Sequence, residues 1–173
     1  MDDVKTHDLL QEISERLDEF DRGNIPRSPD LNKLGHDLAA LLRAPVYPEP
    51  DQDYVVSDTF AVYYSASGQP LLWSADEPLD TPAFVIRIRL SWSGPYALLA
   101  WRRTDDNRTW FLQSEDELPP PLRAVSDKLH RFLNEAGYKI LSGSILDEFI
   151  PGRTSELDDS PQPVREALFS PID

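Results

Sequence analysis

The sequence predicts an α+β domain in which helices pack on one face of an antiparallel sheet. Two segments near the N-terminus repeat their apolar residues every three or four positions, which is the period of a helix. The middle of the chain changes to a period of two, which is the period of a strand, and short turns join its strands. Because helices and strands are grouped rather than alternating, we expect a meander of four to six strands. Two N-terminal helices and one C-terminal helix would cover one of its faces.

The first helix is predicted over residues 5–21, and Gly23 follows it as a stop. Its apolar residues form one stripe: Leu9, Leu10, Ile13, Leu17 and Phe20. The second helix begins after Asp30, which can cap it, and ends before Pro45. Its stripe has the same spacing: Leu31, Leu34, Leu38, Leu41 and Leu42. Residues 46–53 contain two prolines among acidic residues and are predicted to form an extended connector.

The clearest strand covers residues 84–92, where two sets of side chains alternate. The set that we expect to face the core is Phe84, Ile86, Ile88, Leu90 and Trp92. The set that we expect to face water or a partner is Val85, Arg87, Arg89 and Ser91. Further strands are predicted on both sides of this one, separated by turns rich in Gly, Asp and Asn. They cover residues 54–65, 70–73, 96–102 and 108–112.

A third helix is predicted to begin in the proline run at 119–121 and to end at Gly137, a residue suited to a left-handed cap. Its stripe is Leu122, Val125, Leu129, Phe132, Leu133 and Ala136. Residues 138–141 are long enough for one short strand, and Ser144 can cap a last helical turn that ends at Pro151. We therefore expect a single domain over residues 5–152. The acidic tail at 153–173, with a short amphipathic segment at 164–169, is expected to add little to the core.

Composition excludes several classes of protein. The chain has 173 residues, a formal net charge of −14 at pH 7 and no Cys. Such a charge disfavours free nucleic acid and anionic membranes as partners, because phosphates repel it. Zero Cys excludes disulfides and thiolate chemistry. There is no long apolar run and no basic-then-apolar N-terminus, so we expect a cytoplasmic protein.

Catalytic and cofactor motifs are not evident either. The three histidines each stand alone on a predicted helix, without the paired spacing of a zinc site. The seven glycines are scattered, so no phosphate-binding loop can be built from them. Acidic pairs at 51–53 and 105–106 lie in a proline-rich linker and a tight turn, where a structural role is expected rather than a metal. We expect no cofactor and no metal. Whether the protein is an enzyme stays open, because a catalytic triad is assembled in space rather than in sequence.

Charge is distributed unevenly along the chain. Residues 84–113 contain five arginines and two aspartates, a formal charge of +3 in a molecule of −14. Arginine suits bidentate contacts with carboxylates and stacking on aromatic rings, and of the three tryptophans in this segment Trp101 and Trp110 lie close to arginines in the sequence. The candidate binding residues are therefore Arg87, Arg89, Arg103, Trp101 and Trp110. The competing interpretation is that the arginines pair with acids of the same chain and that the tryptophans pack in the core.

The function that these observations favour is a non-enzymatic domain that binds another protein. Bacterial immunity proteins, toxin-neutralising proteins and secretion chaperones share this size and charge, an analogy that identifies no family. The excess of Arg over Lys, 13 to 4, fits a GC-rich bacterial genome. The alternative is a small-molecule-binding domain or enzyme whose anionic ligand is held by the sheet arginines. Arginines and aromatics that line an enclosed pocket would favour the alternative, whereas an open sheet face would favour protein binding.

Overall fold

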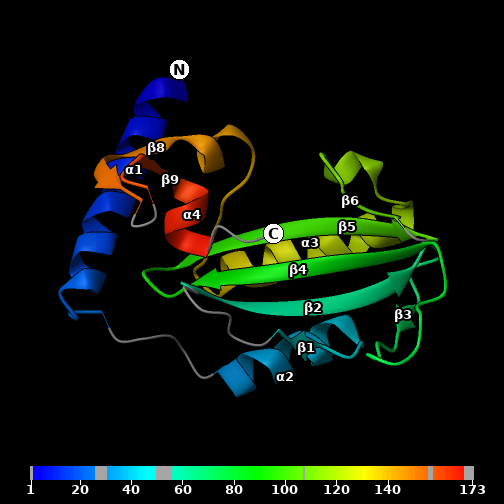
Figure 1. Cartoon of the computed structure of the whole chain (residues 1–173). Helices are drawn as coiled ribbons and strands as arrows, with labels where there is room; N and C mark the ends of the chain where they lie inside the picture. The colour runs from blue at the N-terminus through cyan, green and yellow to red at the C-terminus, as the bar shows by residue number, and fades with distance from the viewer. Residues whose placement is uncertain (1, 26–30, 50–55, 107, 156–157, 170–173) are drawn as a thin grey trace.

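A computed structural model describes residues 2–25, 31–49, 56–106, 108–155 and 158–169. The described chain contains four α-helices and a mixed sheet of seven strands (Figure 1). The helices are α1 (Asp2–Asp21), α2 (Leu31–Leu42), α3 (Pro120–Glu135) and α4 (Val164–Phe169). The strands of the large sheet are β1 (Tyr47–Pro48), β2 (Ser57–Ser65), β3 (Pro70–Leu71), β4 (Ala83–Ser91), β5 (Tyr96–Asp105), β6 (Arg108–Phe111) and β7 (Lys139–Ile140).

The sheet is centred on three long antiparallel strands in the order β2-β4-β5. Both β1 and β3 pair with β2, while β6 and β7 pair with different parts of the opposite edge of β5. The pairing of β7 with β5 is parallel, so the antiparallel meander is confirmed only for the strands before α3. A parallel neighbour is possible because the whole of α3 separates β7 from the earlier strands and carries the chain back along the sheet.

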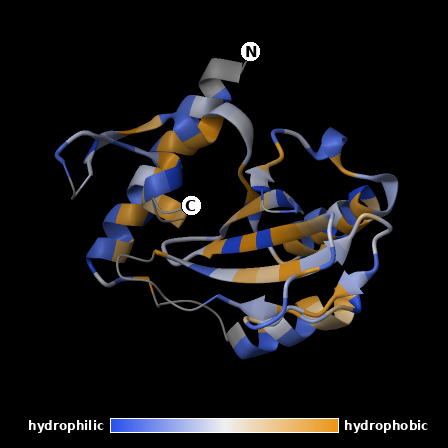
Figure 2. Ribbon diagram, turned by 45° about the vertical axis from the view of Figure 1, so that its right-hand side comes forward, coloured by the Kyte–Doolittle hydropathy of each residue, from blue (hydrophilic) through white to orange (hydrophobic). Residues whose placement is uncertain are grey.

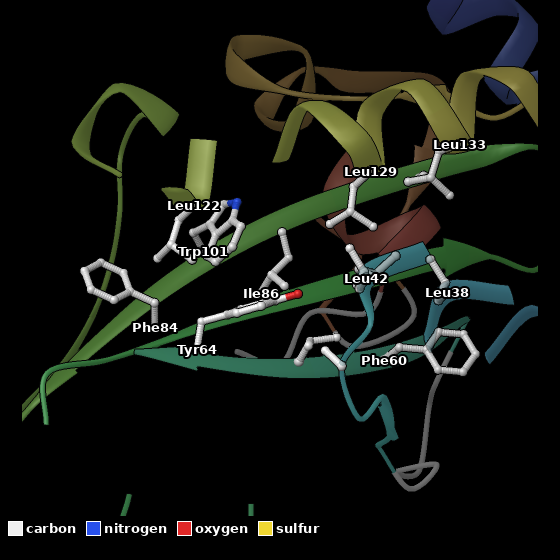
Figure 3. Close-up of a cluster of buried hydrophobic side chains, with 14 of the residues drawn as sticks. Leu38, Leu42, Phe60, Tyr64, Phe84, Ile86, Trp101, Leu122, Leu129 and Leu133 are labelled. Atoms are coloured by element: carbon white, nitrogen blue, oxygen red, sulfur yellow. The ribbon is translucent and has the colours of Figure 1, made fainter. Parts of the chain in front are cut away.

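The first face of the sheet carries the main core. We define this face by the alternate side chains of the three central strands that include Phe60, Ile88 and Trp101. The apolar stripes of α2 and α3 pack on it, as Figure 3 shows for Leu38, Leu42, Leu122, Leu129 and Leu133. Figure 2 shows the matching alternation of hydrophobic and hydrophilic residues along the strands. Most predicted core positions of α2, β4 and α3 are confirmed here. The exceptions are Ala136, which is exposed at the end of α3, and Trp92, which is half-buried and donates from its indole N–H to Asp58. The side chain predicted at Leu31 lies outside the described residues.

The second face of the sheet is covered at one end only. There Tyr96 and Leu98 of β5 pack with the apolar stripe of α1, with α4 and with a 3-10 helix, η2 (Gly143–Asp147). These elements gather at one end of the sheet in Figure 1. The expectation that the helices share one face is therefore wrong. The start of β5 carries apolar side chains on both faces, so both faces need cover at that end.

The expected role of the C-terminal segment is also corrected. Residues 164–169 form α4, whose Val164, Ala167, Leu168 and Phe169 are all buried in the second core. The helical turn expected after Ser144 ends earlier, as η2, and residues 149–154 form a strand instead. This strand, β8 (Phe149–Thr154), pairs with β9 (Pro161–Pro163) in a separate two-stranded sheet. Pro151 lacks the N–H that a helix would need at that position, which favours the extended chain.

The buried hydroxyl of Tyr64 leads to a prediction about alkaline stability. Burial raises the pKa of Tyr64 to about 12, and within the described chain its hydroxyl has no hydrogen-bond partner. Above about pH 10 an unfolded tyrosine releases its proton whereas the folded one keeps it, so this contribution to stability is complete below pH 10 and is lost between pH 10 and 12. We expect Tyr64→Phe to hold or raise the free energy of unfolding at pH 7 by up to ~1–2 kcal/mol, and to weaken its decline above pH 10.

Urea unfolding at pH 7 and pH 11 measures both effects. Tyr96→Phe is the matched control, because the Tyr96 hydroxyl donates to Glu12 at 3.0 Å and its loss should cost ~0.5–1.5 kcal/mol at pH 7. If the two variants lower the free energy of unfolding equally at pH 7, the Tyr64 hydroxyl must have a hydrogen-bond partner in the folded protein.

Candidate functional site

The half of the second face away from α1 and α4 is the candidate site, and we call it the open face. Strand register builds it from two rows that cross the sheet. One row is Tyr47, Ala61, Arg87 and Ala100, and the other is Leu71, Tyr63, Val85, Arg102 and Phe111. Among the described residues, the helices that reach the second face pack at its Tyr96 and Leu98 end. Large side chains therefore stand on this half of the sheet without a helix over them.

Three aromatic rings form a cluster at one side of the open face. Trp73, which follows β3, stacks on Tyr63 with ring centroids 6.1 Å apart and planes 12° apart. Tyr47 meets both rings edge-on, at 5.8 Å from Tyr63 and 6.0 Å from Trp73, and its hydroxyl accepts a hydrogen bond from the Trp73 backbone N–H. Trp73 is still 45% exposed. The aromatic cluster is thus a rigid platform that leaves much of one indole in contact with solvent.

Two arginines occupy the middle and far side of the open face. Arg87 forms an ion pair with Glu49 at 2.9 Å, and the Arg102 guanidinium lies over the Phe111 ring at 4.2 Å. The pKa of Tyr63 is raised chiefly by burial and next by the charge of Glu49, while Arg87 acts in the opposite direction. The raised pKa favours the neutral form of Tyr63, whose ring contacts both Trp73 and Tyr47. The face combines apolar rings with guanidinium groups.

Arg89 lies on the same face as Arg87 but is held inside the protein. It is 4% exposed, and its Nη1 lies 3.4 Å from the carbonyl oxygen of Phe169, to which it donates. The Ser57 hydroxyl donates to the same oxygen at 3.2 Å. The cation therefore stands at the C-terminal end of α4, where a helix favours positive charge. Arg89 therefore links the end of α4 to strand β4 of the sheet.

The other predicted binding residues lie on the first face. Trp101 is 3% exposed in the main core, where its indole N–H donates to the Ser126 hydroxyl at 3.4 Å. Arg103 pairs with Asp105 at 2.8 Å and lies 5.4 Å from the ring centroid of Trp110, which is 40% exposed. The five predicted residues thus do not form one surface. Arg87 belongs to the open face, Arg103 and Trp110 form a separate exposed pair, and Arg89 and Trp101 are buried.

Sequence reasoning did not select the aromatic cluster. Tyr47, Tyr63 and Trp73 come from three segments whose contact depends on the pairing of β1 and β3 with β2. The strand period places Tyr63 on the face opposite Tyr64, which is the one signal in the sequence that points to it. Arg102 and Phe111 were missed for a similar reason, because their stacking follows from the β5–β6 register.

Three further features of the described part of the chain bear on its chemistry. No group of three or more His, Asp or Glu residues there is arranged to hold a metal ion. His36 is exposed, and His130 contacts Glu115 at 2.9 Å. None of the helices in the described ranges has the length and apolar character to cross a bilayer. Comparison of the chain with protein families, with curated proteins and with solved structures gives no match.

Proposed function

We propose that this protein binds another protein through the open face. The observation that carries the proposal is the aromatic cluster, with its half-exposed Trp73, beside Arg87 on the half of a sheet face that the described helices leave uncovered. Tyr, Trp and Arg are the side chains that most often dominate binding energy at protein interfaces. A stacked indole also loses little conformational freedom when a partner covers it, so more of the contact energy is retained.

The partner is expected to present an apolar side chain to Trp73 and a carboxylate to the arginines. Residues 84–113 have a formal charge of +3, against −14 for the whole chain. Of its arginines, Arg87 and Arg102 stand on the open face, and these two guanidinium groups would attract an acidic partner that the acidic remainder of the surface repels. The Arg87–Glu49 pair keeps about a quarter of each side chain exposed, at 23% and 27%, so a partner carboxylate can approach the Arg87 guanidinium beside Glu49.

Capture of partners from the native host by tagged variants tests the proposal. We expect Trp73→Ala to weaken binding of the captured protein by about 30-fold or more, as loss of an interface hot spot does. Arg87→Glu should reduce it strongly as well. Phe149→Ala is the matched control for the first variant, because Phe149 is 58% exposed on the separate two-stranded sheet. Arg22→Glu is the control for the second, because Arg22 is an exposed cation at the end of α1.

A competing docking surface is the acidic remainder of the molecule, which would meet a basic partner. In that case Arg87→Glu leaves binding intact or speeds association, and added salt slows association over a screening length of about 8–10 Å. Loss of binding in both control variants but not in the open-face variants would also contradict the proposal.

A further inference from the structure

The edge of β5 has a gap between two short strands. On this side of β5, residues 102–105 pair with β6 and residues 96–97 pair with β7. Between them, the described chain supplies no strand to residues 98–101, which are paired with β4 on their other side. Each strand residue advances the chain by about 3.3 Å, so the two flanking strands are separated by a stretch of roughly 15 Å along β5.

Two residues in this gap, Leu99 and Trp101, turn their backbone polar groups outward, and the Trp101 carbonyl is already bonded. The Ala97 carbonyl accepts from the Leu141 N–H at 2.9 Å, and the Trp101 carbonyl accepts from the Leu112 N–H at 3.0 Å. Backbone groups alternate in direction along a strand, so Leu99, midway between these two residues, directs its N–H and C=O into the gap. The groups of Leu98 and Ala100 point the other way, toward β4. The gap is therefore a short, preformed edge for strand pairing.

The gap opens into a cavity of about 700 Å³. Its floor is residues 98–101 of β5, one end is formed by residues 111–115, and the other by η2 and Arg165 of α4. The charged side chains of the lining already have partners: His130 contacts Glu115 at 2.9 Å, and Arg165 pairs with Asp147 at 3.2 Å. Arg89, which also lines the cavity, donates to the Phe169 carbonyl at 3.4 Å. The middle offers the side chains of Leu98 and Leu146 together with the backbone of Leu99. This chemistry suits an uncharged, extended backbone with an apolar side chain.

We propose that an extended segment of a partner protein inserts into this gap and adds a short strand between β6 and β7. The segment donates to the Leu99 carbonyl and accepts from the Leu99 N–H, while one of its side chains rests on Leu98 and Leu146. Strand addition of this kind draws affinity from main-chain hydrogen bonds and specificity from alternate side chains. The inference rests on the proposed function in that the occupant is a protein, but it uses different residues from the aromatic cluster.

Amide hydrogen exchange of the full chain, followed by NMR, tests the inference with internal controls. In the free protein the Leu99 amide should exchange at least 10-fold faster than those of Leu98 and Ala100, which face β4. The probe is a set of 12-residue peptides selected from a random displayed library on the wild-type chain. Selected peptides should slow exchange at Leu99 by 10-fold or more and leave its two neighbours unchanged. Selection that produces no peptide protecting Leu99 would overturn the inference.

Two tryptophan substitutions supply a second, independent readout. Ser142 lines the cavity, so Ser142→Trp should fill it and lower peptide affinity by at least 10-fold. Ser144 is exposed on η2, the 3-10 helix that follows Ser142, and the cavity lining does not include it, so Ser144→Trp should leave affinity unchanged.

Trp73→Ala should also leave peptide binding unchanged. If Trp73→Ala abolishes partner capture while no peptide protects Leu99, the proposed function holds and this inference fails. Peptides that lose affinity in Trp73→Ala but not in Ser142→Trp would likewise contradict it.

Discussion

Loss of α4 is expected to unfold one end of the molecule. A chain that stops after Thr154 lacks Val164, Ala167, Leu168 and Phe169, and so exposes the stripe of α1 and the start of β5 that these residues cover. Removing a single buried Leu or Phe typically costs ~2–5 kcal/mol, so removing four core residues together should cost more than ~5 kcal/mol. That is of the order of the whole stability of a small domain. Urea unfolding followed by circular dichroism measures the loss.

Point substitutions separate packing of α4 from other effects of truncation. Leu168→Asp places a carboxylate in the second core, where Leu168 is fully buried, and should approach the effect of truncation. Arg165→Ala in the same helix removes a partly exposed side chain and should change the free energy of unfolding by less than about 1 kcal/mol. A truncated chain that unfolds at the same urea concentration as the full chain would show that α4 does not support the fold.

The second large effect concerns the main core. Leu38, Ile88 and Leu129 come from α2, β4 and α3 and are all fully buried. Each changed to Ala should lower the free energy of unfolding by ~2–5 kcal/mol. His36→Ala and Asp105→Ala alter side chains that reach solvent, and each should stay within about 0.5–1 kcal/mol of the original. Thermal or urea unfolding of the five variants provides the comparison. If His36→Ala costs as much as Leu38→Ala, the assignment of α2's buried side is wrong.

Periodicity located the elements that bury many side chains. Apolar residues repeat at helical spacing over several turns of α1, α2 and α3, and at strand spacing along β2, β4 and β5. The buried side of each of these elements can therefore be predicted from the sequence. The two-residue strands β3 and β7 fall within the short strands predicted at 70–73 and 138–141, whereas β1 lies in the segment expected to be a connector. None of the three is long enough for its period to show which strand it pairs with. The parallel position of β7 is likewise a consequence of where α3 ends.

The candidate site was predicted only in part, for a related reason. Alternation placed Arg87 and Arg89 correctly on one face of β4, yet one is half-buried on the open face and the other is sealed beneath α4. That difference depends on a segment 80 residues further along the chain, which local patterns do not reveal. Trp101 was selected because it lies among arginines, but its strand position puts it on the face that α3 covers.

The more exposed of two accessible tryptophans lies outside the basic segment: Trp73 is 45% exposed, against 40% for Trp110. Trp73 reaches the open face because β3 returns along β2 and brings it onto Tyr63. Aromatic side chains and arginines that are distant in sequence thus become neighbours across the strands. The basic segment contributes Arg87 and Arg102 to the open face, whereas the rings that we expect to carry most of the binding energy were brought together by strand pairing.

Site-specific photo-crosslinking in the native host tests the proposed binding surface most directly. A photoreactive phenylalanine analogue at position 73 lies on the open face, and the same analogue at position 36 lies on α2, which packs on the opposite face of the sheet. We predict that position 73 yields a covalent adduct with one partner protein, and that Arg87→Glu in the same chain removes the adduct. Position 36 should give none. An adduct with the same partner from position 36, and none from position 73, would contradict the assignment of the open face as the binding surface.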